Sequence, residues 1–183
     1  MLRNIPAKPL VALLLLSLPL SLPAQRRKKQ VSPPPQQDTP SKVDYKSVGS
    51  SLPAIRAVYP GKAVYTSKDV QNDANLFIML FNPTCEHCEE MTLAFEKNVG
   101  QFKRSNILLL AAPAMGPYLE YFGNNTHVGN YPHIRVGLDS SDFIQNTFRY
   151  EALPQVNVYS PEGKLLKSLS GITSIDSLKP FIQ

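Results

Sequence analysis

The chain has 183 residues, a formal net charge of +5 and 43% hydrophobic residues, which fits a globular protein with one folded domain. Eight of its 19 basic residues precede position 50, and from Ser51 onward 11 basic residues stand against 12 acidic ones. The folded part therefore lacks the basic surface that binding to a phosphate backbone requires, which excludes nucleic acid as a partner.

The N-terminus has the layout of a secretory signal. Arg3 and Lys8 precede an apolar run over 10–22, and Ala24 marks a cleavage site. The run is shorter than the roughly 20 apolar residues of a membrane span. We expect a signal peptide over 1–24, with an uncleaved anchor as the alternative. Either way the protein is expected in the periplasm or cell envelope, with a membrane attachment only if the segment is uncleaved.

Residues 25–46 are basic and then proline-rich, with three prolines in a row at 33–35 and almost no apolar side chains. Such a segment buries too little surface to offset the entropy lost on ordering. The sequence therefore predicts a flexible linker over 25–46, followed by a domain over 47–183.

Strands and helices alternate in the first part of this domain. Residues 76–81 and 107–112 are continuous apolar runs of the kind found in buried parallel strands. Residues 86–99 and 140–150 place their apolar side chains at helical spacing. This order predicts an α/β fold with a central mixed sheet flanked by helices.

The C-terminal part has the pattern of an antiparallel hairpin. After Pro154, residues 155–160 and 164–169 read as extended strands, and a Pro-Glu-Gly turn joins them. Thr173 and Asp176 have the spacing of a capping box, which predicts a closing helix before the C-terminus.

The only two cysteines of the chain form the motif Cys85-Glu86-His87-Cys88, directly after the first apolar run. Thiol–disulfide exchange passes through a mixed disulfide, so a second thiol nearby is needed to release the partner. The motif opens the predicted helix, where unsatisfied backbone N–H groups and the helix dipole lower the pKa of a thiol. We therefore expect Cys85 to be a reactive thiolate.

The motif is also compatible with two roles outside redox exchange. A structural disulfide would close a loop over only two residues and constrain the unfolded chain very little. A metal site is the second role, because thiolates suit Cu(I), and three histidines are available as further ligands: His87, His127 and His133. The sequence has no paired cysteine cluster of the zinc type. We expect no metal and no cofactor.

The order of these elements resembles the thioredoxin-like fold, and the resemblance covers about residues 47–183. Val48-Gly49 with Leu52-Pro53 is similar to the N-terminal extension of the exported bacterial thioredoxin family that includes TlpA and ResA. The long stretch over 113–139 is similar to the central insertion of the same family. Cys85, Cys88 and Pro154 are the most specific points of the resemblance.

The resemblance implies roles for individual residues. Cys85 would attack the partner disulfide and Cys88 would resolve the product. Leu153-Pro154 would form a cis peptide bond facing the cysteines, with the Leu153 backbone pairing with an extended substrate. On the residues alone, a trans proline that starts an edge strand fits better.

Neighbouring residues are expected to tune the redox pair. A cationic His87 would stabilise the Cys85 thiolate and raise the reduction potential, whereas the carboxylate of Glu86 acts in the opposite direction. The sequence also departs from the family at two positions. Thr84 replaces the usual Trp before the first cysteine, and Met79 stands where thioredoxins carry a buried Asp.

Aromatic residues gather in the stretch over 113–139, among them Tyr118, Tyr121 and Phe122. They either form a surface for partner recognition or pack beneath the insertion. Taken together, the residues and the resemblance predict an exported thiol–disulfide oxidoreductase. Its partners would be protein disulfide or dithiol substrates and a redox partner protein in the cell envelope. The alternatives are a copper-binding module and a non-catalytic protein-binding domain.

Overall fold

The computed structural model describes residues 44–59, 61, 64–140, 147, 148 and 150–183, and these residues belong to one compact unit. The signal peptide or anchor predicted over 1–24 lies outside the described residues. So does the linker predicted over 25–46, apart from its last three residues. Within the part of the chain that the structure describes, every helix is too short or too polar to span a bilayer.

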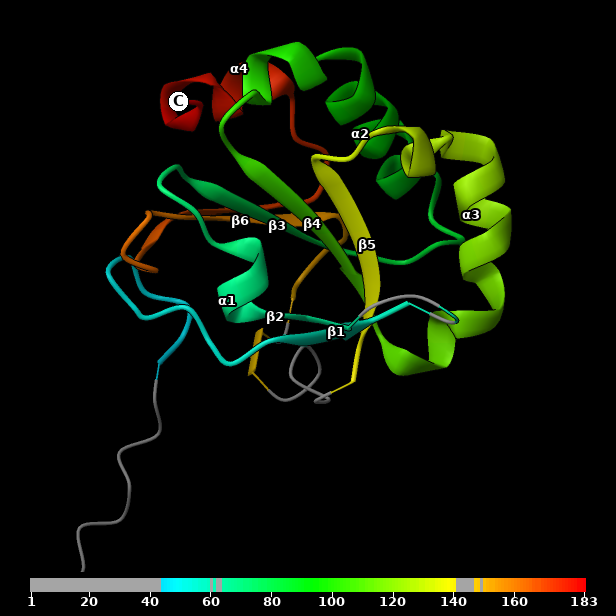
Figure 1. Cartoon of the computed structure of the whole chain (residues 1–183), viewed down its shortest axis with the longest axis horizontal. Coiled ribbons are helices and arrows are strands. Elements are labelled where there is room, and N and C mark those ends of the chain that lie inside the picture. Colours follow the sequence, from blue (N-terminus) through cyan, green and yellow to red (C-terminus); the bar gives the residue numbers. More distant parts are fainter. Residues whose placement is uncertain (1–43, 60, 62–63, 141–146, 149) are drawn as a thin grey trace, which may run out of the picture. The chain divides into compact units, whose positions relative to one another are not determined.

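A seven-stranded mixed sheet forms the centre of this unit, in the order β2-β1-β5-β4-β3-β6-β7 (Figure 1). The three middle strands β5, β4 and β3 are parallel, and the strands on both sides of them are joined by antiparallel pairing. The bounds are β1 (Arg56–Val58), β2 (Val64–Thr66), β3 (Leu76–Phe81), β4 (Asn106–Ala111), β5 (Ile134–Asp139), β6 (Gln155–Tyr159) and β7 (Leu165–Ser170). The predicted α/β architecture is confirmed.

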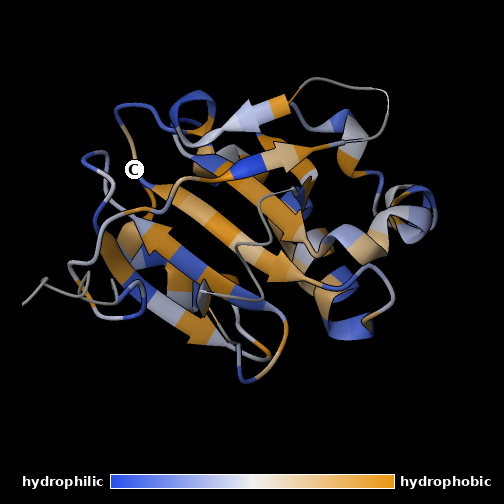
Figure 2. Cartoon of the chain, turned by 90° about the horizontal axis from the view of Figure 1, so that it is seen from below, coloured by the Kyte–Doolittle hydropathy of each residue, from blue (hydrophilic) through white to orange (hydrophobic). Residues whose placement is uncertain are grey.

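The alternation of side chains along β3 divides the core into two clusters. Phe77, Met79 and Phe81 face one cluster, together with side chains of α2 (Glu86–Lys97), α3 (Leu119–Thr126) and α4 (Ile175–Leu178). The even-numbered residues of β3 face the other cluster, with α1 (Ser67–Val70) and Phe148. Because β3 is buried on both faces, all its residues are apolar, which explains the continuous apolar run (Figure 2).

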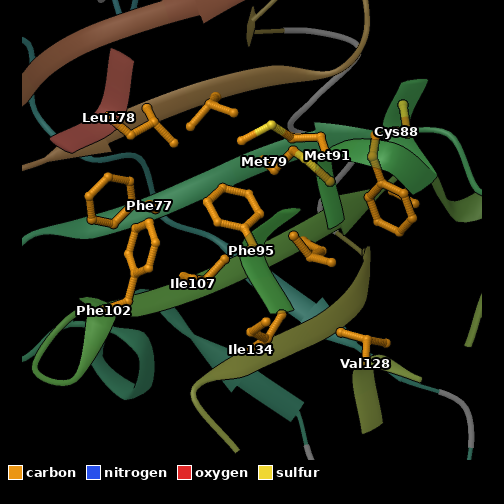
Figure 3. Packing of buried hydrophobic residues seen from close by; sticks show 14 of the residues in the cluster. Phe77, Met79, Cys88, Met91, Phe95, Phe102, Ile107, Val128, Ile134 and Leu178 are labelled. Atoms are coloured by element: carbon orange, nitrogen blue, oxygen red, sulfur yellow. The ribbon is translucent and has the colours of Figure 1, made fainter. Parts of the chain in front are cut away.

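Aromatic side chains fill the larger cluster beneath α2 (Figure 3). The Phe102 ring, at the end of η1 (Val99–Phe102), meets the Phe77 ring edge to face with centroids 5.1 Å apart. It also meets the Phe95 ring of α2 at 5.5 Å. These contacts hold α2 against β3 and so fix the position of the first residues of α2.

The stretch over 113–139 contains a strand that was not predicted, although residues 134–139 alternate apolar and polar or small side chains. After η2 (Pro113–Tyr118), α3 and η3 (Val128–Asn130), strand β5 pairs in parallel with β4 and antiparallel with β1. The predicted insertion therefore extends the sheet. Figure 1 shows α3 beyond β5.

Two helix predictions have different outcomes. The helix predicted over 140–150 falls mostly on residues outside the described part of the chain. The capping box predicted from Thr173 and Asp176 is wrong. The Thr173 hydroxyl donates to the Gly171 carbonyl, Asp176 pairs with Lys179 at 2.6 Å, and α4 begins after Ser174. The closing segment is α4 followed by η5 (Lys179–Phe181).

Candidate active site

A short loop carries the chain from the end of β3 to the start of α2. The Asn82 side-chain oxygen accepts hydrogen bonds from the backbone N–H and the hydroxyl of Thr84, at 2.9 and 3.0 Å. The Asn82 carbonyl accepts the backbone N–H of Cys85 at 3.0 Å. This turn is built by an Asn-Pro pair, and it directs Cys85 to the first position of the helix.

Cys85 is the N-cap residue of α2, with an extended backbone conformation. Its carbonyl accepts the backbone N–H groups of Cys88 and Glu89, at 3.0 and 3.1 Å. Cys85 is half-buried between the exposed residues Thr84 and Glu86, so it is the more accessible of the two cysteines. The predicted position of Cys85 at the helix N-terminus is confirmed, and the N–H groups there favour an anion.

Cys88 lies one turn further along α2 and is fully buried. The pKa of the Cys88 thiol is raised to about 12, mainly because the thiol is buried. A hydrogen bond with the Cys85 sulfur also raises this pKa, whereas a backbone hydrogen bond from Asn82 lowers it. Cys88 therefore stays protonated at neutral pH. Met79 is buried in the same cluster and offers no group that accepts a proton.

The Leu153–Pro154 peptide bond is cis. Leu80 of β3 pairs with Gln155 of β6, so Pro154 comes opposite Phe81, at the end of β3 from which the loop to Cys85 departs. Leu153 and Cys85 both pack against the larger core cluster. The predicted pairing of a substrate with the Leu153 backbone stays a prediction.

The residues expected to tune the redox pair lie on the surface. Glu86 and His87 are exposed in the first turn of α2. Among the described residues, neither the Glu86 nor the His87 side chain is engaged in a hydrogen bond or ion pair. Both side chains can therefore approach Cys85. Their opposite effects on the reduction potential stay predictions.

Some residues beside the site were not expected from the sequence. Ile172 is 76% exposed, next to Gly171, whose backbone N–H donates to the Pro154 carbonyl at 2.9 Å. Tyr121 of α3 and Leu93 of α2 face the same groove as Thr84. The sequence signal was the cluster of aromatics, in which Phe122 is buried whereas Tyr121 is exposed. No pattern in the sequence marked Leu93 or Ile172 as neighbours of the site.

The histidines considered as metal ligands do not gather at the cysteines. His87, His127 and His133 are all exposed. Among the residues that the structure describes, no three His, Cys, Asp or Glu side chains come close enough to hold a metal ion. The site therefore offers two thiols without a third ligand from the described residues.

The chain is similar to solved structures, whereas no protein-family model and no curated protein matches it. The thioredoxin domain of a thiol-disulfide oxidoreductase from Bacteroides vulgatus is 16% identical, with a TM-score of 0.62, over 75% of this chain and 99% of that one. A thiol:disulfide interchange protein from Bacteroides sp. is 15% identical, with a TM-score of 0.59, over 75% of this chain and 91% of that one.

A secreted disulfide oxidoreductase from Mycobacterium tuberculosis, homologous to E. coli DsbE, is 14% identical, with a TM-score of 0.57. The match covers 69% of this chain and 92% of that one. These likenesses, together with the strand order and the strand–loop–helix unit, confirm that the chain has the thioredoxin-like fold.

Proposed function

We propose that this chain is an exported thiol–disulfide oxidoreductase that exchanges disulfides with proteins of the cell envelope. The observation that carries the proposal is the difference between its two thiols. Cys85 is accessible at the N-terminus of α2, and Cys88 is buried one turn behind it. The names of several structural neighbours, which are thiol-disulfide oxidoreductases, support the same activity.

The exchange proceeds in two steps. The Cys85 thiolate attacks one sulfur of a partner disulfide, the partner S–S bond breaks, and the other partner sulfur leaves as a thiolate. Cys88 then loses its proton to solvent and attacks the Cys85 sulfur of the mixed disulfide. The partner's second sulfur leaves as a thiolate, so the partner gains two electrons and the Cys85–Cys88 pair is oxidised. A separate dithiol protein restores the pair by the reverse exchange.

Burial, the largest cause of the raised pKa of Cys88, persists in the mixed disulfide, so the second step is expected to be the slow one. A thiol with a pKa of about 12 has only a very small thiolate fraction at neutral pH. Met79 supplies no proton acceptor inside the cluster, so the proton has to leave through the accessible side of the site. The mixed disulfide with Cys85 is therefore expected to be long-lived.

Export rests on the predicted signal over 1–24. It is supported by the secreted Mycobacterium tuberculosis protein among the structural neighbours. Expression of the full chain in a bacterium, followed by cell fractionation, tests this part. Recovery of the folded protein only in the cytoplasm contradicts export and leaves the exchange activity as a separate question.

Two cysteine variants test the activity. Cys85→Ser is expected to lose exchange with a model protein disulfide, because Cys88, the only other thiol, is buried. Cys88→Ser is expected to accumulate a mixed disulfide through Cys85, visible by mass spectrometry. Circular dichroism of both variants controls for folding. Full activity of a folded Cys85→Ser protein would falsify the proposed function.

The reduction potential of the Cys85–Cys88 pair decides the direction of electron flow. A value near that of thioredoxin, about −270 mV, favours a reductant, and a value nearer −120 mV favours an oxidant. Glu86 and His87 act in opposite directions on it, so we expect a potential between these limits.

A further inference from the structure

A groove of about 310 Å³ opens beside Cys85, between the first turns of α2 and the start of α3. Its lining residues are Pro83, Thr84, Glu86, Glu89, Glu90, Leu93 and Tyr121. Thr84 and Glu86 are the chain neighbours of Cys85, so this α2–α3 groove begins at the accessible thiol. A partner joined to Cys85 has to lie next to it.

Two large apolar side chains in the α2–α3 groove are exposed. Leu93 is 39% and Tyr121 is 57% exposed, although the nearby residues Met91 and Phe122 are buried in the core. Exposed side chains of this size beside a reactive thiol offer apolar contact area to another chain. The fold does not need them, because α2 and α3 are already held by the buried residues on their other faces.

The rest of the α2–α3 groove is acidic. Glu86 and Glu90 line it, and Glu89 accepts one hydrogen bond, from the Asn125 side chain at 3.3 Å. None of the described residues that line the groove is basic. Both ion pairs found among the described residues lie elsewhere, at Arg104–Asp73 and Lys179–Asp176. Three carboxylates therefore surround Leu93 and Tyr121 without a charged partner from the described residues.

One kind of side chain satisfies both parts of this surface. Lys and Arg bury their aliphatic stems on apolar surface and keep the charged end among polar groups. A Lys or Arg of a partner can lay its stem on Leu93 and Tyr121, contact the Tyr121 ring through its cation, and place its charge among the carboxylates. An acidic partner side chain would meet three like charges at the same place.

We propose that the α2–α3 groove selects protein partners that carry Lys or Arg within a few residues of the reacting cysteine. This inference rests on the proposed function, because Cys85 has to form the mixed disulfide that brings such a segment to the groove. It adds a substrate class to that function, namely disulfides flanked by basic residues.

The test compares exchange rates of three synthetic peptides of equal length, each with one cysteine activated as a mixed disulfide and flanked by Lys, by Ser or by Glu. In about 0.01 M salt, the full chain is expected to react about tenfold or more faster with the Lys peptide than with the Glu peptide. In about 1 M salt, where the Debye length is about 3 Å, the ratio should approach one.

Variants of the groove locate the effect. The double variant Glu89→Gln/Glu90→Gln is expected to reduce the Lys-to-Glu rate ratio several-fold, and Tyr121→Ala should slow the Lys peptide without reversing the preference. Glu162→Gln is the matched control, because it removes one carboxylate from the β6–β7 turn, at the opposite end of β3 from Cys85. Its rate ratio should equal that of the unaltered chain.

A second measurement separates this inference from the proposed function. In Cys85→Ser/Cys88→Ser protein, a cysteine-free Lys peptide should shift the NMR amide signals of Glu90 and Tyr121 at low salt. Equal rates for the three peptides, or a preference unchanged in the double variant, would overturn the inference while the exchange activity stands. Absence of exchange with every peptide would overturn the function instead, and the NMR shifts alone would then decide whether the groove binds basic segments.

Discussion

The two thiols of the candidate site differ although only two residues separate them. Cys85 is half-buried at the start of α2, whereas Cys88 is fully buried and this burial raises its pKa to about 12. Residues three apart share one face of a helix, so both cysteines lie toward the same core cluster. They differ because Cys85 caps the open end of α2, whereas Cys88 lies one turn further along, where the helix covers the core. The same geometry supports the proposed roles, in which Cys85 attacks and Cys88 performs the slower release step.

Substitutions at Glu86 and His87 should move the reduction potential in opposite directions. Glu86→Gln removes a negative charge near the Cys85 sulfur and should raise the potential, and His87→Ala removes an imidazole that can carry a positive charge and should lower it. Each shift is expected to be about 10–20 mV, because both side chains are exposed to solvent. Equilibration with glutathione measures both values. Shifts of the same sign would contradict this account.

Glu96 is a buried carboxyl group far along α2 from the cysteines. It is 7% exposed, its Oε1 has no hydrogen-bond partner in the described part of the chain, and burial raises its pKa to about 7. The folded protein therefore keeps a proton between about pH 4.5 and pH 7 that the unfolded chain releases. The contribution of Glu96 to the free energy of unfolding is therefore fully present below pH 4.5 and is lost as the pH rises through 7.

Glu96→Gln should consequently stabilise the protein at alkaline pH. The gain in free energy of unfolding is expected to reach about 3 kcal/mol above pH 7 and to be near zero below pH 4.5. Urea unfolding at about pH 4 and pH 8 measures the difference. Glu90→Gln, nearer the start of the same helix and outside the core clusters, is the control and should change little at either pH. An equal gain at both pH values would refute the role of titration.

At the scale of elements, the close approach of β1 and β5 depends on a glycine. A Cβ atom at Gly137 of β5 would lie 2.9 Å from the Cβ of Ala57 in β1. The two strands are neighbours in the sheet, and Ala57 is fully buried. The short side chains at these two positions therefore allow β1 to pair with β5.

Gly137→Ala should destabilise the protein by about 1–3 kcal/mol, because neither strand can move without breaking its pairing. The additional change Ala57→Gly removes the opposing atom and should recover part of this loss. Gly123→Ala in α3 is the contrast, since no atom lies within 4 Å of its new Cβ and a helix gains from alanine. Thermal unfolding of the unaltered chain and the three variants measures these effects, and an undisturbed Gly137→Ala protein would refute the close contact.

At the scale of the whole molecule, redox state and stability are linked. A Cys85–Cys88 disulfide closes a loop over two residues and hardly constrains the unfolded chain. The N-terminus of α2 favours a negative charge only when the helix is folded, and only the reduced pair can supply one there.

The reduced protein should therefore unfold at higher guanidinium concentration than the oxidised protein. The Cys88→Ser variant cannot form the intramolecular disulfide, so oxidising conditions should not change its stability in this way. A more stable oxidised form would contradict the link and would indicate a reducing role for the pair.

Local patterns in the sequence were sufficient for the CxxC motif and for strands β3 and β4 at the centre of the sheet. The apolar runs of β3 and β4, the helix that starts at the CxxC motif and the hairpin after Pro154 each lie within one short segment. Each leaves a periodic or compositional signal, because strands buried on two faces and amphipathic helices place apolar residues regularly.

Only the tertiary structure decided which distant segments meet. Strands β1 and β2 have three residues each, too few for a pattern that marks a strand. β5 alternates apolar residues with Arg135, Gly137 and Asp139, which is a strand signal, but its place between β4 and β1 comes only from the tertiary structure. The same holds for the Glu96 carboxyl in the core and for Tyr121 beside Glu90, since residues from different elements share a site only after the helices have packed. The proposed redox pair Cys85 and Cys88, with the neighbours expected to tune it, is thus encoded locally, whereas the α2–α3 groove proposed to select partners arises from packing.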